Sequence, residues 1–244
     1  MVEARKWIAV LVALAVSGPA LAASEMKLEP VGNDVDNVVS LQRGARNFMN
    51  YCSGCHSARY VRFNRVARGL GLSEDQVIEN LMFNAEKTFE TVLAAMPAED
   101  AARWFGQAPP DLSLLARSRG TDYIYNFLKG FYLDADSPTG VDNMVLAGTS
   151  MPHVLWELQG FQRAVFTEVG QNGSVFEHFE PFSTGSLSAE EYDSFVRDTV
   201  NFMEYIAEPV RSTRRKMGVW VLMYLTVFLI IASMLKKQIW KDVS

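Results

Sequence analysis

The chain contains 244 residues, of which 49% are hydrophobic and 21% are charged, and its formal net charge is −5. This length and composition suit one globular domain together with membrane segments. Because the sequence has no internal repeat, no low-complexity tract, no phosphate-binding loop and no nucleic-acid-binding signature, we expect no nucleic acid among its partners.

Residues 1–22 have the pattern of a secretory signal peptide. A short basic start precedes the apolar residues 7–16, and residues 20–22 give the small-x-small pattern of a cleavage site. The apolar run is too short to span a membrane. We therefore expect the domain that follows, residues 23–210, to be exported to the periplasm of a bacterium.

The first predicted helix of the domain covers residues 37–51, and a Cys-x-x-Cys-His motif follows at its C-terminal end. On a helical turn, Cys52, Cys55 and His56 share one face. The two thiols can then reach the two vinyl groups of one porphyrin, and the imidazole can reach its iron. This is the attachment pattern of a c-type haem. We therefore expect one haem c, bound covalently through Cys52 and Cys55, with His56 as one axial ligand.

Other interpretations of the motif fit the sequence less well. A zinc site needs about four ligands, but both cysteines of the chain lie in the motif, and the other histidines are His153 and His178. A redox-active Cys-x-x-Cys is expected near a βαβ pattern, which the sequence lacks. A disulfide between two cysteines separated by only two residues would constrain the fold very little.

Capping signals and apolar periodicity predict a mainly helical domain beyond the motif. Ser73 with Gln76, and Ser188 with Glu191, have the spacing of capping boxes. An Asn-Gly step at residues 172–173, between two short apolar runs, predicts a β-hairpin. The predicted helices cover residues 74–83, 98–106, 111–118 and 121–131, and a long amphipathic helix follows Ser188.

The sixth ligand of the iron decides the function, because an open position allows chemistry on small molecules and a filled one favours electron transfer. A predicted long loop, residues 132–150, ends at Met151, where a soft thioether could be presented to the iron. Met144 and His153 are the nearest competitors. On residue type alone, Met151 is better explained as an ordinary core residue than as a ligand, since methionine commonly fills core space.

The C-terminal part of the chain predicts one membrane anchor. Residues 217–235 carry no charge, and at about 1.5 Å per residue they span about 28 Å, close to the hydrocarbon core of a bilayer. A basic juxtamembrane segment, residues 211–216, precedes the span, and a tail of residues 236–244 follows it. The flanking Lys and Arg residues differ little in number, so the export signal decides the orientation. We expect the haem domain in the periplasm and the tail in the cytoplasm.

The expected soluble domain, residues 23–210, is strongly acidic. It contains 14 Lys and Arg residues and 26 Asp and Glu residues, a net charge of −12. The electrostatic field of this charge would attract a basic partner and make the association depend on salt concentration. The alternative is that the acidic charge serves only to keep the domain soluble.

Several motifs, in this order, resemble those of the cytochrome c1 family, the haem subunit of ubiquinol–cytochrome c reductase. The resemblance covers most of the mature chain, so it is more specific than the Cys-x-x-Cys-His motif alone. One departure follows Pro152, where the family usually has further prolines, and it leaves His153 as a rival ligand. The matching stretches are residues 51–57, 108–113, 116–119, 122–123, 138–140, 151–152 and 207–209, followed by a basic Arg-Lys-Met-Gly entry into the C-terminal span.

The resemblance implies roles for individual residues. It implies Met151 as the sixth ligand of the iron, with Pro109 and Pro110 packed near the haem edge. It also implies that Arg117 approaches a propionate and that Tyr123 lines the haem pocket. Ligation by His and Met raises the potential of a haem, which suits a carrier that accepts electrons from a quinol-driven centre.

The implied fold is mainly α: a cytochrome c-like soluble haem domain with a small β-hairpin and one C-terminal transmembrane helix in contact with membrane lipid. The implied function is to pass single electrons from a Rieske iron–sulfur protein to a periplasmic c-type cytochrome. The chain would act beside cytochrome b in the bacterial inner membrane, within a quinol-oxidising respiratory complex, and would not be an enzyme on its own. Two alternatives stay open: a haem enzyme with an open distal site, of the peroxidase or nitrite reductase type, and a free-standing membrane cytochrome c that feeds a terminal oxidase.

Overall fold

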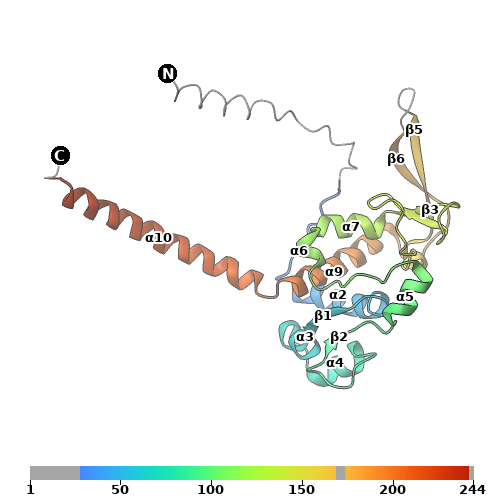
Figure 1. Ribbon diagram of the computed structural model, residues 1–244, viewed down its shortest axis with the longest axis horizontal. Helices are drawn as coiled ribbons and strands as arrows, with labels where there is room; N and C mark the ends of the chain where they lie inside the picture. The colour runs from blue at the N-terminus through green and yellow to red at the C-terminus, as the bar shows by residue number, and fades with distance from the viewer. Residues whose placement is uncertain (1–27, 169–173, 242–244) are drawn as a thin grey trace.

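The computed structural model describes residues 28–168 and 174–241. A helical domain carries one long C-terminal helix that projects away from it (Figure 1). Three expectations lie outside the described residues: the signal peptide of residues 1–22, the Asn-Gly turn at residues 172–173, and the last three residues of the tail.

Helices and three short antiparallel strand pairs make up the described part of the chain, which confirms the predicted fold class. The strand pairs are β1 (Ala58–Arg62) with β2 (Thr91–Val92), β3 (Phe131–Leu133) with β4 (Val141–Asn143), and β5 (Gln162–Glu168) with β6 (Ser174–Pro181). The helices are α2 (Val38–Tyr51), α3 (Phe63–Leu70), α4 (Glu74–Leu81), α5 (Ala98–Phe105), α6 (Leu115–Ser118), α7 (Thr121–Lys129), α8 (Trp156–Gln159), α9 (Ala189–Ala207) and α10 (Arg211–Ile239).

Helices α2 and α9 pack against each other at the centre of the domain (Figure 1). Phe48 of α2 and Phe202 of α9 are fully buried, and their ring centroids lie 5.6 Å apart. Gly44 permits this close packing, because a Cβ at this position would clash with the backbone carbonyl of Asp198. The Asp198 carboxylate accepts hydrogen bonds from Arg43 at 2.5 and 3.0 Å. These contacts fix α2 against α9, and the cysteine motif follows directly from the C-terminal end of α2.

Both predicted capping boxes are present. At the start of α4, Ser73 Oγ accepts from Gln76 N at 3.1 Å, and Gln76 Oε1 accepts from Ser73 N at 2.9 Å. At the start of α9, Ser188 and Glu191 make the same two hydrogen bonds, at 3.3 and 2.9 Å. Local side chains therefore satisfy the first backbone N–H groups of both helices and set where each helix begins.

Two stretches differ from the sequence-based prediction. The predicted helix of residues 111–118 shrinks to α6, because Asp111 is used outside a helix: its carboxylate accepts from Arg59 N at 3.0 Å and from Ser113 N at 2.9 Å. The predicted loop of residues 132–150 contains β4, which pairs with β3. Strand pairs as short as these depend on tertiary contacts rather than on local propensity.

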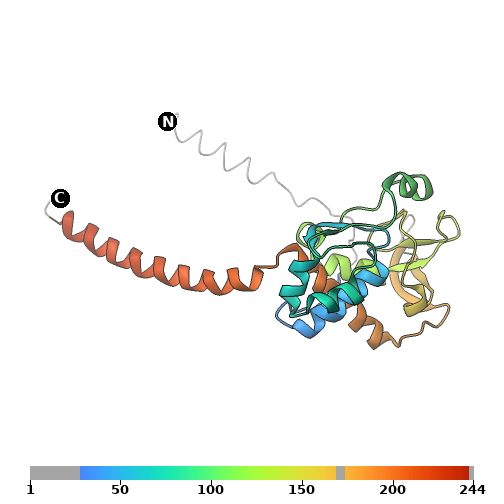
Figure 2. The ribbon, with the colours of Figure 1, turned by 90° about the horizontal axis from the view of Figure 1, so that it is seen from below.

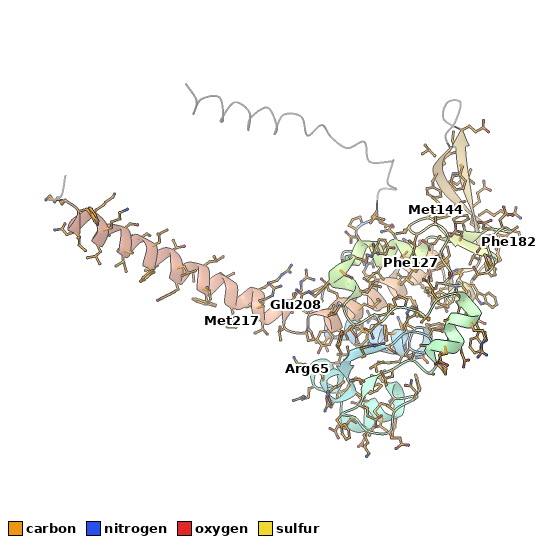
Figure 3. The ribbon with its side chains drawn as sticks, in the orientation of Figure 1. Arg65, Phe127, Met144, Phe182, Glu208 and Met217 are labelled. Carbon is orange, nitrogen blue, oxygen red and sulfur yellow. The ribbon has the colours of Figure 1, made fainter. Side chains whose placement is uncertain are left out.

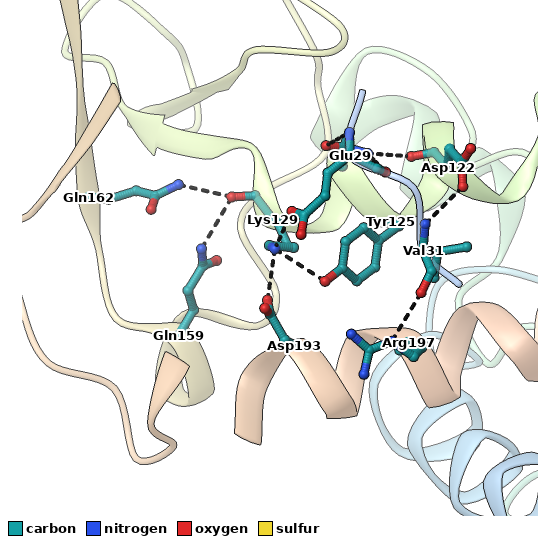
Figure 4. A network of polar contacts seen from close by, with 10 residues as sticks. Glu29, Val31, Asp122, Tyr125, Lys129, Gln159, Gln162, Asp193 and Arg197 are labelled. Carbon is teal, nitrogen blue, oxygen red and sulfur yellow. Dashed lines mark hydrogen bonds and ion pairs between the residues drawn. The ribbon is translucent and has the colours of Figure 1, made fainter. Parts of the chain in front are cut away.

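An extended N-terminal arm ties α7 to α9 (Figure 4). Glu29 N donates to Asn126 Oδ1 at 3.0 Å. The Glu29 carboxylate lies 2.9 Å from Lys129 Nζ, which also lies 2.7 Å from Asp193 of α9 and 3.2 Å from the hydroxyl of Tyr125. Because α7 forms one wall of the site described below, the arm and α9 help to hold that wall in place.

Helix α10 is long enough and apolar enough to cross a membrane. It has 29 residues, its most apolar 18-residue window has a mean hydropathy of 2.3, and none of that window is buried in the domain. At about 1.5 Å per residue it is about 44 Å long. Figures 1 and 2 show it projecting away from the domain in both views. It therefore fits the single-pass membrane anchor expected from the sequence.

Two ion pairs join α9 to α10. Glu204 pairs with Arg211, and the carboxylate of Glu208 accepts hydrogen bonds from Arg214 at 2.5 and 3.1 Å. Figure 3 places Glu208 where the domain meets α10, with Met217 farther along that helix. The predicted basic juxtamembrane segment is thus the beginning of α10, and its charges are partly used to link the helix to the domain.

Candidate functional site

A cavity of about 320 Å³ lies between α2, α7, α9 and the segments that precede α6 and α8. Most of its lining is apolar. Cys52, Cys55 and His56 all line it, and so does Met151. The fold therefore brings the cysteine motif and the candidate thioether to one cavity, although they lie far apart in the sequence.

The Cys-x-x-Cys-His motif continues the end of α2 as a helical turn. Cys52 N donates to Phe48 O at 2.9 Å, and His56 N donates to Cys52 O at 2.9 Å. The side chain of Ser53, between them, is buried and donates to Met49 O at 2.7 Å, so it does not compete for the cavity. The expected sharing of one face by the three functional side chains follows from this turn.

His56 is held with one of its ring nitrogens engaged. Its Nδ1 lies 2.8 Å from the carbonyl oxygen of Pro110. Because a carbonyl only accepts, Nδ1 carries the proton, and Nε2 keeps the lone pair that a metal ion needs. Burial lowers the pKa of His56, although the hydrogen bond to Pro110 opposes this effect. The lowered pKa favours the neutral ring, which is the form that binds iron.

Pro109 and Pro110, which the resemblance implied to pack near the haem edge, both line the cavity. The carboxylate of Asp111, which directly follows Pro109 and Pro110, accepts hydrogen bonds from Arg59 N at 3.0 Å and from Arg59 Nε at 3.1 Å. These bonds fasten the proline segment to β1, the strand that follows the motif. The Pro110 carbonyl is thereby held where it meets His56.

The surroundings of the two thiols do not suit redox or thiolate chemistry. Burial raises the pKa of Cys52 to about 12, with a smaller contribution from Cys55, and burial also raises the pKa of Cys55. A redox-active Cys-x-x-Cys would instead have a lowered thiol pKa. Within residues 28–168 and 174–241, no cluster of three or more His, Cys, Asp or Glu side chains is placed to hold a metal ion. The raised thiol pKa values argue against a redox-active Cys-x-x-Cys at this site.

Met151 is the one candidate for the sixth ligand, out of the three considered, that lines the cavity. The side chain of His153 is 5% exposed, and its ring stacks on Phe131 with a centroid distance of 5.1 Å and meets Phe161 edge-on at 6.1 Å. Neither His153 nor Met144 belongs to the lining. The geometry therefore favours Met151 over both rivals.

Arg119, rather than Arg117, reaches the cavity. Arg119 lines it with its guanidinium 5.6 Å from the ring centroid of Tyr123, which is itself a lining residue. Arg117 is exposed and lies near Glu208, whose pKa is lowered mainly by its hydrogen bond to Arg214 and further by the charge of Arg117. Residues two positions apart in a helical turn are separated by a rotation of about 200° around its axis, so the two arginine side chains leave the chain on opposite sides. Of the two arginines, Arg119 is therefore the one that the fold brings to the cavity, and the role implied for Arg117 stays a prediction.

Several lining residues were not predicted from the sequence. Asn47 of α2 donates to Thr199 Oγ1 and to Phe195 O of α9, both at 3.2 Å. The spacing of Asn47, Tyr51 and Cys55, four residues apart, is the signal that could have placed the first two on the face of the motif. The lining residues on α9 and α7 have no such local signal. Other unpredicted members of the lining are Phe105, Gln107, Phe127, Leu146, Thr149 and Met203.

Comparison with known proteins gives the family. The profile of the Cytochrome C1 family matches residues 33–243. The chain belongs to the cytochrome c1 family. It is 44% identical over 218 residues to a cytochrome c1 of Allochromatium vinosum, covering 88% of this chain and 89% of that protein. It is 41% identical over 219 residues to the ammonia monooxygenase gamma subunit of Nitrosomonas europaea, covering 90% of each, and 30% identical over 240 residues to a cytochrome c1 of Rhodospirillum rubrum, covering 83% and 81%.

Membership of the cytochrome c1 family confirms the function expected from the sequence at the level of the family. The protein is an electron-transfer haem protein, and it is not an enzyme on its own. The cofactor that the family implies is haem c. A mainly helical domain with an apolar cavity beside a Cys-x-x-Cys-His motif, and one apolar C-terminal helix, fits this role.

Proposed function

We propose that the cavity holds one haem c, attached covalently through Cys52 and Cys55, with His56 and Met151 as its axial ligands. The observation that carries the proposal is that these four side chains line one cavity. The hydrogen bond from His56 Nδ1 leaves Nε2 available for iron. A haem with two protein ligands has no open position, so the site favours electron transfer over reaction with small molecules.

The haem would supply the one-electron chemistry, and residues of this chain would set the conditions for it. The apolar lining surrounds the haem with little polar surface, and an axial thioether from Met151 would raise the reduction potential. The hydrogen bond to the Pro110 carbonyl orients the imidazole of His56 and makes it more basic. Arg119, packed over the ring of Tyr123, is placed to pair with a propionate.

The partners in this proposal are a Rieske iron–sulfur protein as donor and a periplasmic c-type cytochrome as acceptor. A place beside cytochrome b is supported by similarity to a protein named cytochrome b/c1 from Bradyrhizobium diazoefficiens, which is 27% identical over 239 residues and of which 33% is covered. The net charge of −12 on residues 23–210 suits an acceptor with a basic docking face. Co-purification with cytochrome b and a Rieske protein distinguishes this proposal from a free-standing cytochrome c.

In the proposed topology α10 makes one pass through the bacterial inner membrane. The export pattern of residues 1–22 and the projection of α10 from the domain support this arrangement. Protease added to spheroplasts is expected to digest residues 23–210 and to spare the tail. The successive segments are the signal peptide 1–22, the periplasmic domain 23–210, the juxtamembrane segment 211–216, the membrane span 217–235 and the cytoplasmic tail 236–244.

The variant Met151→Ala tests the assignment of the sixth ligand. In the full-length protein in detergent, we expect a low-spin wild type that does not bind carbon monoxide when reduced. Met151→Ala is expected to bind carbon monoxide and to have a lower potential while keeping its haem. Met144→Ala is the matched control, because Met144 does not line the cavity, and it is expected to behave as the wild type. An unchanged spectrum and potential in Met151→Ala would contradict the assignment.

The attachment and the main alternative have their own measurements. We expect haem to stay with the wild-type chain on a denaturing gel and to be largely lost from Cys52→Ser and Cys55→Ser. Ready binding of carbon monoxide by the reduced wild type would mean an open iron position. That result would favour a haem enzyme of the peroxidase or nitrite reductase type over the electron carrier.

A further inference from the structure

The loop that leads to Met151 is held by two adjacent residues at the end of β4. We propose that Asp142 and Asn143 are positioning residues for the axial thioether, and that they set the fraction of molecules in which it reaches the iron. Neither residue lines the cavity, so each would act through the backbone. The inference rests on the proposed function, because it takes Met151 as the ligand.

Asp142 closes the loop with one oxygen of its carboxylate. Its Oδ1 accepts hydrogen bonds from Gly148 N at 2.8 Å, from Thr149 N at 3.2 Å and from Asn143 N at 2.8 Å. Hydrogen bonds to an ionised acceptor are stronger than neutral ones. Thr149 is 9% exposed and lines the cavity. The Asp142 carboxylate therefore fixes the backbone two residues before Met151.

Asn143 joins the same loop to α7. This side chain is fully buried, and its Oδ1 accepts from Val145 N at 2.9 Å and from Leu146 N at 3.3 Å. Its Nδ2 donates to the backbone carbonyl of Phe127 at 2.8 Å. Phe127 and Leu146 both line the cavity. Because an amide both donates and accepts, one side chain links two walls of the site.

The other end of the ligand segment rests on the same β3–β4 hairpin. His153 stacks on Phe131 of β3, and Phe131 is the register partner of Asn143. Residues 149–153 are therefore held at both ends by one hairpin, with Met151 in the middle. Methionine is a flexible side chain, so a fixed backbone on both sides is what limits where its sulfur can lie.

A purely structural role for these hydrogen bonds predicts a different result from a positioning role. Loss of a structural bond lowers the unfolding temperature but leaves the iron ligands of the folded protein unchanged. Loss of a positioning bond changes the ligands of the folded protein. Asp134 is a matched control, because it lies in the same hairpin and its Oδ1 accepts from Asp136 N at 3.0 Å, away from the Met151 loop.

The test compares Asp142→Ala, Asp142→Asn and Asp134→Ala as full-length, haem-loaded protein in detergent. The readouts are the charge-transfer band from thioether to ferric iron, the reduction potential, and the carbon monoxide affinity of the reduced protein. We expect Asp142→Ala, which removes all three hydrogen bonds to the Asp142 carboxylate, to weaken the band and to bind carbon monoxide at least about tenfold more tightly, because a tenfold shift in a two-state population needs a free-energy change no larger than that of about one net hydrogen bond. Asp142→Asn keeps an acceptor oxygen and is expected to retain the band, as is Asp134→Ala.

Asn143→Asp supplies an independent test that does not depend on the accumulation of Asp142→Ala. This nearly isosteric change turns the donor that faces the Phe127 carbonyl into an acceptor, and we expect it to weaken the band in the same way. A full band with wild-type carbon monoxide affinity in either Asp142→Ala or Asn143→Asp overturns the inference, as does an equal loss in Asp134→Ala. A wild type that lacks the band refutes ligation by Met151 instead, and so separates failure of the proposed function from failure of this inference.

Discussion

The contact of α2 with α9 at Gly44 gives a prediction in which two effects compete. Alanine is favoured over glycine inside a helix by about 1 kcal/mol, so Gly44→Ala would stabilise an isolated α2. In the folded protein the new Cβ would clash with the backbone carbonyl of Asp198 and lie 2.8 Å from Phe202 Cβ. Backbone atoms of α9 cannot rotate aside, so the two helices must separate. Overpacking of this kind costs about 1–3 kcal/mol, and we expect a net loss of stability.

The assay is urea unfolding of the haem-loaded, full-length protein in detergent, followed by circular dichroism. Arg46→Ala and Arg46→Gly provide the reference, because Arg46 is an exposed residue of the same helix. The difference between these two variants measures the intrinsic preference for alanine without a packing change. Gly44→Ala should unfold at a lower urea concentration than the wild type, opposite in sign to this reference difference. A stabilised Gly44→Ala would refute the reasoning.

Two further predictions concern polar contacts made by residues of α7. The hydroxyl of Tyr192, a residue that is 3% exposed, donates to Leu128 O at 2.9 Å; Tyr192→Phe should lower the unfolding free energy by about 1 kcal/mol in the same urea assay, and an unchanged midpoint would contradict this. Burial opposes the charge of Lys129, but its hydrogen bonds to Asp193 and Glu29 outweigh burial and raise its pKa (Figure 4). A raised pKa stabilises the fold below the unfolded-state value of about 10.4, and this stabilisation is lost as the pH rises through the folded-state value. The melting temperature should therefore fall more steeply above about pH 10.4 in the wild type than in Lys129→Met, and equal slopes would contradict the assignment.

Features that depend on neighbouring residues could be predicted from the sequence. The capping boxes at Ser73 and Ser188 set two helix starts, and the uncharged stretch of residues 217–235 identified the anchor within α10. Cys52 and His56 line the same cavity because a single helical turn fixes how their side chains are arranged, and their spacing in the sequence indicates that turn. In each case the physical cause lies within a few residues of the signal.

Features that depend on distant contacts could not be predicted in this way. The pairing of β3 with β4 could not be predicted, because a strand of three residues is too short to show the alternation of apolar and polar side chains that indicates a strand. The resemblance implied that Arg117 approaches a propionate, and it gave no role to Arg119, which lines the cavity; the direction of each side chain depends on how α6 packs. The burial of His153 against Phe131 likewise became visible only with the fold.

The size of the cavity has a consequence for the order in which the protein matures. The side chains that line an apolar cavity of about 320 Å³ gain packing partners only when the cavity is filled, and unfilled core volume lowers stability. A chain that folded fully before it received its haem would lack these contacts. Under the proposed function, the thioether bonds are therefore expected to form before the side chains around the cavity are fully packed, and the contacts of the Met151 segment with the haem are expected to form late in folding.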